Sequence, residues 1–129
     1  MRPIVCDAET AELEVHGWLE SLDVEPDPVN IDMQRAVKLV RRDMLRFLPD
    51  TQEFVLHLYN PVKLDNGDIV EQLKIREPNG ADMQASSSGS DVEQLQKMLS
   101  KVSGLPLGVV QRIGMRDQNS ASMVITFFV

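Results

Sequence analysis

Two runs in which large apolar residues recur at every second position flank an Asn-Gly pair, and no other feature constrains the fold of this chain as strongly. The runs cover residues 54–59 and 69–76, with Asn66-Gly67 in the connection between them. A period of two is typical of a β-strand, and Asn-Gly suits a tight turn in which both central residues have a positive φ. The sequence therefore predicts an antiparallel hairpin. Pro61 is expected at an edge or a bulge, because proline donates no ladder hydrogen bond.

Length and composition exclude several classes of protein. The chain has 129 residues, of which 43% are hydrophobic and 26% charged, as is usual for about one soluble domain. Its single cysteine, Cys6, excludes an internal disulfide. No apolar run approaches the ~18 residues of a membrane span, and the first residues do not resemble a signal peptide. We therefore expect no membrane association and a cytoplasmic location.

The N-terminal part has the three- and four-residue apolar spacing of two amphipathic helices. The first is predicted over 7–23, with Asp7 as its cap and an apolar face that includes Trp18 and Leu22. The second is predicted over 31–48, with Asn30 as its cap and Pro49 at its end. We expect residues 1–50 to form this helical pair and residues 51–129 to form the hairpin with further helices, and we expect the two parts to form one compact unit.

Charge is distributed unevenly along the chain. Residues 1–28 contain eight acidic residues and one basic residue, whereas residues 29–129 contain twelve of each. The predicted second helix is basic, and the cations that share its polar side are Arg35, Lys38, Arg42 and Arg46. One interpretation of the acidic segment is an arm for a basic partner, or a mimic of nucleic acid. The corresponding interpretation of the basic helix is that it binds a membrane surface, a nucleic acid or a partner. We favour the simpler one, in which the two helices pack together and partly neutralise each other.

The C-terminal part contains several turn signals and further helical patterns. A short helical turn is predicted over 81–85, a flexible loop over 86–90, and a helix over 91–102 with Asp91 and Gln94 as a capping box. A short helix or buried turn follows over 107–113. Residues 118–128 fit a helix or a strand, and we prefer a helix with Asp117 as its cap. The predicted fold class is α+β, an antiparallel β-hairpin packed with about four to five helices.

The sequence predicts no catalytic, cofactor-binding or metal-binding residue. His16, His57 and Cys6 match no zinc-ligand spacing, and Asp65 and Asp68 lack the other acids of a calcium loop. No nucleophile and base occur at a meaningful spacing, which disfavours an enzyme. With one Trp and one Tyr, stacking on nucleic acid is also disfavoured.

Within residues 54–84, a strand with a proline is followed by a glycine turn and a second strand that ends in Arg-Glu-Pro. The residues of this pattern are Pro61, Gly67, Leu73, Ile75, Arg76, Glu77, Pro78, Gly80 and Asp82. In this pattern the segment resembles the opening of the small tail assembly chaperones of Mu-like and related long-tailed phages. An apolar helix, the break at Gly104-Leu105-Pro106 and Asp117 before an apolar end extend the similarity to about residue 128.

The resemblance implies a non-enzymatic chaperone in the bacterial host cytoplasm, without a cofactor. It implies that the chain binds the phage tape-measure protein and helps recruit tail-tube subunits; homo-oligomerisation is left open. Two alternatives are an acidic inhibitor or regulator of a host nucleic-acid-binding protein, acting through residues 7–27, and a structural tail or connector component of the virion. For Arg76 and Glu77 we favour a local cap or ion pair over a partner contact. The candidate partner-binding residues are Trp18, Leu22, Arg35, Lys38, Arg42, Arg46, Arg76 and Glu77.

Overall fold

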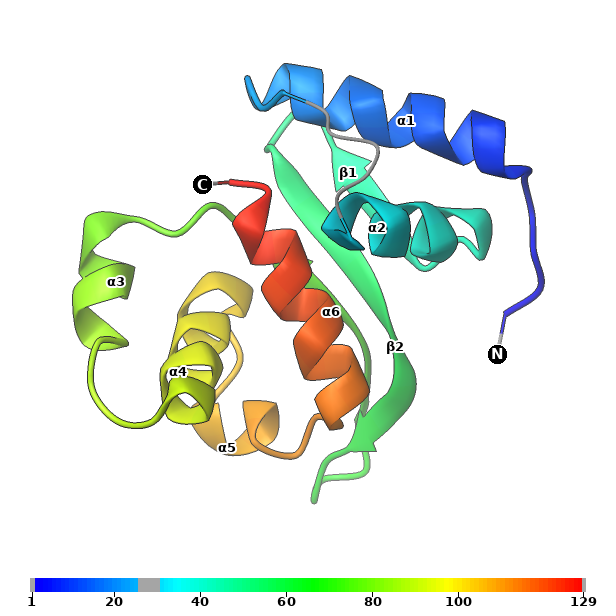
Figure 1. The fold of residues 1–129 in the computed structure, drawn as a ribbon. Coiled ribbons are helices and arrows are strands. Elements are labelled where there is room, and N and C mark those ends of the chain that lie inside the picture. Colours follow the sequence, from blue (N-terminus) through cyan, green and yellow to red (C-terminus); the bar gives the residue numbers. More distant parts are fainter. Residues whose placement is uncertain (1, 26–30, 129) are drawn as a thin grey trace.

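A computed structural model describes residues 2–25 and 31–128, which contain six helices and a three-stranded antiparallel sheet (Figure 1). The predicted α+β class and the N-terminal helical pair are confirmed. The expected cap at Asn30 lies outside the described residues. The elements are α1 (Ala8–Ser21), α2 (Ile31–Arg41), β1 (Leu45–Leu48), β2 (Glu53–Lys63), β3 (Ile69–Ile75), α3 (Gly80–Ala85), α4 (Asp91–Ser103), α5 (Leu107–Val110) and α6 (Met115–Thr126).

The predicted hairpin is present as β2 and β3, but its turn differs from the expected one. Gly67 has a φ of 90° and its N–H donates to the Leu64 carbonyl at 3.0 Å, whereas Asn66 has no positive φ. Residues 65–67 thus form a three-residue loop that needs a left-handed residue only at its end. The Asn66 side chain instead accepts a hydrogen bond from the Asp68 N–H at 2.9 Å.

The prediction of one helix over 31–48 is wrong, because the chain reverses after Arg41 and continues as a strand. Asp43 has a φ of 54°, and the N–H groups of Asp43 and Met44 donate to the carbonyls of Val40 and Leu39. This is the Schellman pattern, with aspartate in the left-handed position that glycine usually occupies. The strand that follows, β1, pairs with β2 and places Arg46 on the sheet instead of on the basic helix.

All four phenylalanines and the single tryptophan of the chain meet in one aromatic cluster around Phe54. Phe54 is fully buried, and its ring centroid lies 5.8 Å from Trp18, 4.9 Å from Phe47 and 5.4 Å from Phe128. The cluster therefore joins α1, β1, β2 and the end of α6. Burying each such ring stabilises the fold by roughly 1.5–3 kcal/mol, so α1 is held to the sheet by its apolar face.

Pro61 lies in an irregular part of β2, as predicted, where the register with β3 shifts between His57 and Val62. There the backbone N–H groups of Tyr59 and Asn60 donate to the Asp117 carboxylate at 2.8 and 3.1 Å. Asp117 has no exposed surface. It was expected to cap a helix, but α6 begins at Met115 after Gly114, so Asp117 lies in the first turn and binds the bulge of β2.

Most of the other predicted elements are present, and the capping box of α4 differs in its residues. Asp7 caps α1 by accepting from the Thr10 N–H at 2.8 Å. The Thr10 side chain is the main cause that lowers the pKa of Asp7, and this backbone hydrogen bond is the second. The capping box of α4 is formed by Ser90 and Glu93, one residue before the expected pair. The C-terminal segment is helical, as preferred. Among the described residues, no helix is both long enough and apolar enough to cross a membrane.

We expect Asp117→Ala to lower the free energy of unfolding by roughly 2–4 kcal/mol, because it leaves two backbone N–H groups of the bulge without their acceptor. Asp117→Asn keeps one acceptor oxygen and is expected to lose about half as much. Urea denaturation measures both. Glu71→Ala, at an exposed position of β3, is the control and is expected to change stability by less than about 0.5 kcal/mol. Equal stability of Asp117→Ala and the control would contradict the assigned role.

Candidate functional site

A groove lies between α2 and α6, which contact each other beside Tyr59 of β2. Its volume is about 270 Å³. The α2 side contributes Arg35 and Lys38, and the α6 side contributes Arg116. The remaining lining residues are Leu39, Tyr59, Asn119 and Ser120. The groove thus has cations on both sides and an aromatic ring between them.

A second hollow of about 340 Å³ continues this groove along α2. Lys38 and Tyr59 line both hollows, and the second adds Ile4, Arg41 and Arg42. We call the two together the basic groove. Its five cations are Arg35, Lys38, Arg41, Arg42 and Arg116, and neither hollow has an acidic lining residue among the described parts of the chain.

The cations of the basic groove differ in how firmly they are held. The Arg116 guanidinium lies over the Tyr59 ring, 5.0 Å from its centroid, a cation–π contact that orders the side chain. Arg41 Nε donates to the Cys6 carbonyl at 3.3 Å, and Arg42 donates to the Arg2 carbonyl at 2.8 Å. In the described ranges of the chain, no ion pair involves Arg35, Lys38 or Arg116.

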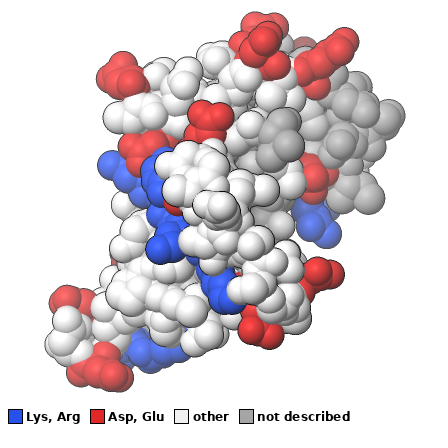
Figure 2. Space-filling view, turned by 90° about the vertical axis from the view of Figure 1, so that its left-hand side faces the viewer, with Lys and Arg blue, Asp and Glu red and all other residues white. Residues whose placement is uncertain are grey.

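The acidic and basic helices pack side by side, as we favoured, since α1 and α2 are in contact. Glu12 and His16 of α1 line a hollow together with Lys38 and Arg41 of α2. No salt bridge joins the two helices within the described residues. On the face drawn in Figure 2, acidic side chains gather along the upper rim, and Lys and Arg gather near the middle.

The structure brings three of the predicted partner-binding residues together, because Arg35, Lys38 and Arg42 all line the basic groove. Arg46 is exposed on β1 and lines neither hollow. Trp18 is 8% exposed and belongs to the aromatic cluster. Leu22 is half-buried after the end of α1. A partner-binding role for these residues stays a prediction.

Tyr59, Arg116, Asn119 and Ser120 were not among the sequence candidates. Tyr59 lies about 60 residues before the other three in the chain, and it meets them only because α6 packs on the bulge of β2. No spacing rule connects such residues. The sequence contains one related signal, the Arg116-Asp117 pair before an apolar segment. In the structure Arg116 lines the groove, whereas Asp117 is buried.

Arg76 joins the end of β3 to α3 and α4. Its guanidinium contacts both oxygens of Asp82, at 2.6 and 3.1 Å, and donates to the Lys101 carbonyl at 3.1 Å. Asp82 is 5% exposed and also accepts from the Asn79 N–H at 2.9 Å. Glu77 contributes only its carbonyl, at 3.0 Å, so the ion pair that fixes this turn is formed with Asp82.

These contacts shift the pKa values of the pair in opposite directions. The side-chain hydrogen bond from Arg76 is the main cause that lowers the pKa of Asp82, with a smaller contribution from the Asn79 backbone. The hydrogen bond to Asp82 likewise raises the pKa of Arg76. The pair therefore remains ionised at neutral pH and serves the local structure.

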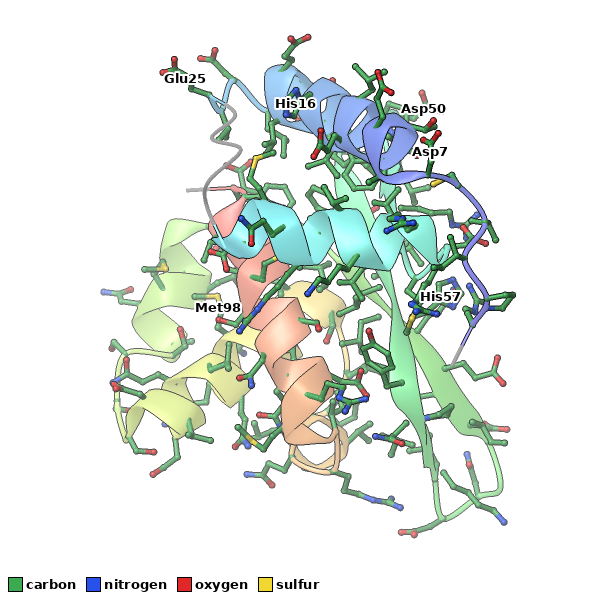
Figure 3. All side chains as sticks on the ribbon, turned by 45° about the vertical axis from the view of Figure 1, so that its right-hand side comes forward. Asp7, His16, Glu25, Asp50, His57 and Met98 are labelled. Atoms are coloured by element: carbon green, nitrogen blue, oxygen red, sulfur yellow. The ribbon has the colours of Figure 1, made fainter. Side chains whose placement is uncertain are left out.

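The two histidines lie apart, His16 on α1 and His57 on β2 (Figure 3). Burial is the first cause that lowers the pKa of His57, followed by the charges of Arg2 and Arg46. In residues 2–25 and 31–128, no three His, Cys, Asp or Glu side chains are grouped so that they could hold a metal ion.

A family model described as "Phage tail assembly chaperone proteins, E, or 41 or 14" matches residues 55–129, more than half of the chain. The chain belongs to this family of phage tail assembly chaperones. The resemblance recognised in the sequence is thereby confirmed. No curated protein and no solved structure matches the chain.

The family segment of this tail assembly chaperone contains β3, α3 to α6 and nearly all of β2. It therefore includes the Arg76–Asp82 pair and the contact of Asp117 with the bulge. The helices α1 and α2 and the strand β1 lie outside it. The basic groove is built across this boundary, since α2 contributes one wall and α6 the other.

The lowered pKa of Asp82 predicts a pH-dependent contribution to stability. A carboxylate whose pKa is lower in the folded state stabilises that state above its unfolded pKa of about 3.9, and this contribution disappears as the pH falls through the folded-state pKa. We therefore expect the difference in free energy of unfolding between wild type and Asp82→Asn to be largest above about pH 5 and to shrink towards about pH 2.

Urea denaturation across this pH range measures the effect. Glu77→Gln is the matched control, because it removes an exposed carboxylate from the same segment without touching the Arg76–Asp82 pair. A difference between wild type and Asp82→Asn that stays constant with pH would show that the ion pair does not contribute to stability.

Proposed function

We propose that this tail assembly chaperone binds the tape-measure protein and helps recruit tail-tube subunits around it, without catalysing a reaction, in the cytoplasm of a bacterial host. The observation that carries the proposal is the family match over residues 55–129. A long helical protein that awaits assembly exposes apolar and charged faces, and a small chaperone shields them by offering complementary surfaces.

The family segment has apolar side chains on its outer surface that fit this role. Met83 of α3 is 60% exposed, Val92 of α4 is 45% exposed and Met115 of α6 is 53% exposed. Methionine is flexible and polarisable, so such side chains adapt to partner surfaces of different shape. They supply adaptable contact area, whereas the basic groove supplies charge.

We also propose that residues 1–50 act together with the family segment. Trp18 of α1 packs on Phe54 of β2, and Phe47 of β1 packs on the same ring. Removing α1 would expose this aromatic cluster to water. The N-terminal helices therefore contribute to the partner surface as part of the same unit.

Co-expression tests the proposed partners. We expect the tagged full-length chain to co-elute in size-exclusion chromatography with the tape-measure protein of its phage, and the tail-tube protein to join this complex. The major capsid protein of the same phage is the control and is expected to elute separately. Failure of the chain to co-elute with either tail protein would contradict the proposal.

Mass spectrometry of purified virions separates the chaperone from the structural alternative. A chaperone is expected to be absent from finished particles, whereas a connector or tail component remains in them at a fixed number of copies. Recovery of a basic host protein that binds through α1, in place of the tail proteins, would favour the inhibitor alternative.

A further inference from the structure

We infer that the basic groove is the docking site for an acidic helical segment of the partner protein, in which carboxylates repeat at three- and four-residue intervals. This inference rests on the proposed function for the identity of the partner, whereas the chemistry of the groove is argued from the chain itself.

The positive charge of the groove is local, and an acid of α1 lies beside it, since Glu12 lines a neighbouring hollow with Lys38 and Arg41. Five cations line the groove itself, and no acidic residue does so in the described parts of the two hollows. Arg35, Lys38 and Arg116 have no ion-pair partner among the described residues. Like charges held close together repel one another, and a concave surface concentrates their field. A ligand that brings negative charge removes this repulsion.

The spacing of the cations matches that of a helix. Arg35, Lys38 and Arg42 are three and four residues apart, so they form one row along α2 and just beyond its end. The row spans seven residues, about 10 Å. A helix laid along this row presents carboxylates at the same intervals when they occur at positions i, i+3 or i+4, and i+7. Arg116 reaches the segment from the α6 side.

The groove is also ordered before a partner binds. The Tyr59 N–H is held by Asp117, and the Tyr59 ring is covered by the Arg116 guanidinium. Arg116 directly precedes Asp117 in the chain, so the hydrogen bond between Asp117 and β2 positions both the guanidinium and the ring that it covers. A guanidinium that is already placed loses less conformational freedom when it binds a carboxylate in a bidentate manner.

Apolar groups beside the cations fit a protein segment better than a nucleic acid. Leu39 lines the first hollow, and Ile4, which is 53% exposed, lines the second. Among the described residues, Tyr59 is the one aromatic side chain in either lining, which offers little for stacked bases. The net charge of −7 also opposes the approach of a polyanion as long as DNA or RNA.

The first experiment uses a fluorescent helical peptide of about 15 residues with glutamates at i, i+3 and i+7 on one face, and a peptide with glutamines at these positions. Fluorescence anisotropy with the full chain is expected to show binding of the glutamate peptide, weakened when the salt concentration rises from about 50 to about 300 mM. Arg35→Glu/Lys38→Glu is expected to weaken this binding about tenfold or more.

Lys63→Glu/Lys74→Glu is the matched control. It makes the same change in net charge at two exposed sheet positions, on β2 and β3, and neither residue lines the basic groove. Its peptide affinity is expected to stay within about twofold of wild type. Urea denaturation of both double variants verifies that they are folded. Equal weakening by both variants, or equal binding of the glutamine peptide, would overturn the groove assignment.

The second experiment repeats the capture of the tape-measure protein with the same variants. Loss of capture with Arg35→Glu/Lys38→Glu but not with the control supports the inference. Capture by all variants, with no peptide binding, overturns the inference and leaves the proposed function standing. Peptide binding without capture of the tape-measure protein overturns the proposed partner and leaves the groove as a site for an acidic helix. Failure of both experiments overturns both proposals.

Two other occupants are separated by the same variants. A labelled single-stranded oligonucleotide that binds more tightly than the glutamate peptide, and is lost with Arg35→Glu/Lys38→Glu, would overturn the inference in favour of nucleic acid. Dimers of the chain alone that dissociate with this variant would show that the acidic α1 of a second copy occupies the groove, which also overturns it.

Discussion

One buried carboxylate stabilises the place where pairing in the sheet fails. Between His57 and Val62 the register of β2 against β3 shifts, and the backbone there would otherwise have N–H groups without acceptors, at a cost of about 1–3 kcal/mol each. Asp117 accepts from two of them, with none of its own surface exposed. Its position in the first turn of α6 also places its charge at the positive end of the helix dipole. The bulge and α6 therefore require each other.

The position of the basic groove follows from this contact. Once Asp117 is fixed against β2, the preceding residue, Arg116, lies over the ring of Tyr59, which is one of the two residues whose N–H groups Asp117 binds. On the other side, the aromatic cluster around Phe54 fixes α1 and β1, and the short connection from β1 back to α2 places Arg35 and Lys38 opposite Arg116. Internal packing thus determines which cations meet on the surface.

Local signals in the sequence were sufficient for the hairpin, the bulge at Pro61, the cap at Asp7 and the helical pair, because periodicity and turn chemistry depend on residues close together in the chain. They were insufficient for β1. Residues 44–48 continue the apolar spacing of α2, and the residue that ends the helix is Asp43 with a positive φ, where glycine would have been a visible signal. The role of Asp117 was also misread, since an acid before an apolar run resembles a cap. Its acceptor role depends on N–H groups 57 and 58 residues away, which no local pattern contains.

The charged groups of this chain fall into two kinds, and the difference bears on function. Asp117, Asp82 and Arg76 are engaged by the fold, through short hydrogen bonds to backbone N–H groups, carbonyls or each other. Arg35, Lys38 and Arg116 take part in no ion pair in the described ranges, although the chain as a whole carries excess negative charge. Within the described residues, the groove cations form no ion pair with the acids of α1, although Glu12 lines a neighbouring hollow with Lys38 and Arg41. The groove therefore retains charge that a partner with complementary carboxylates can neutralise.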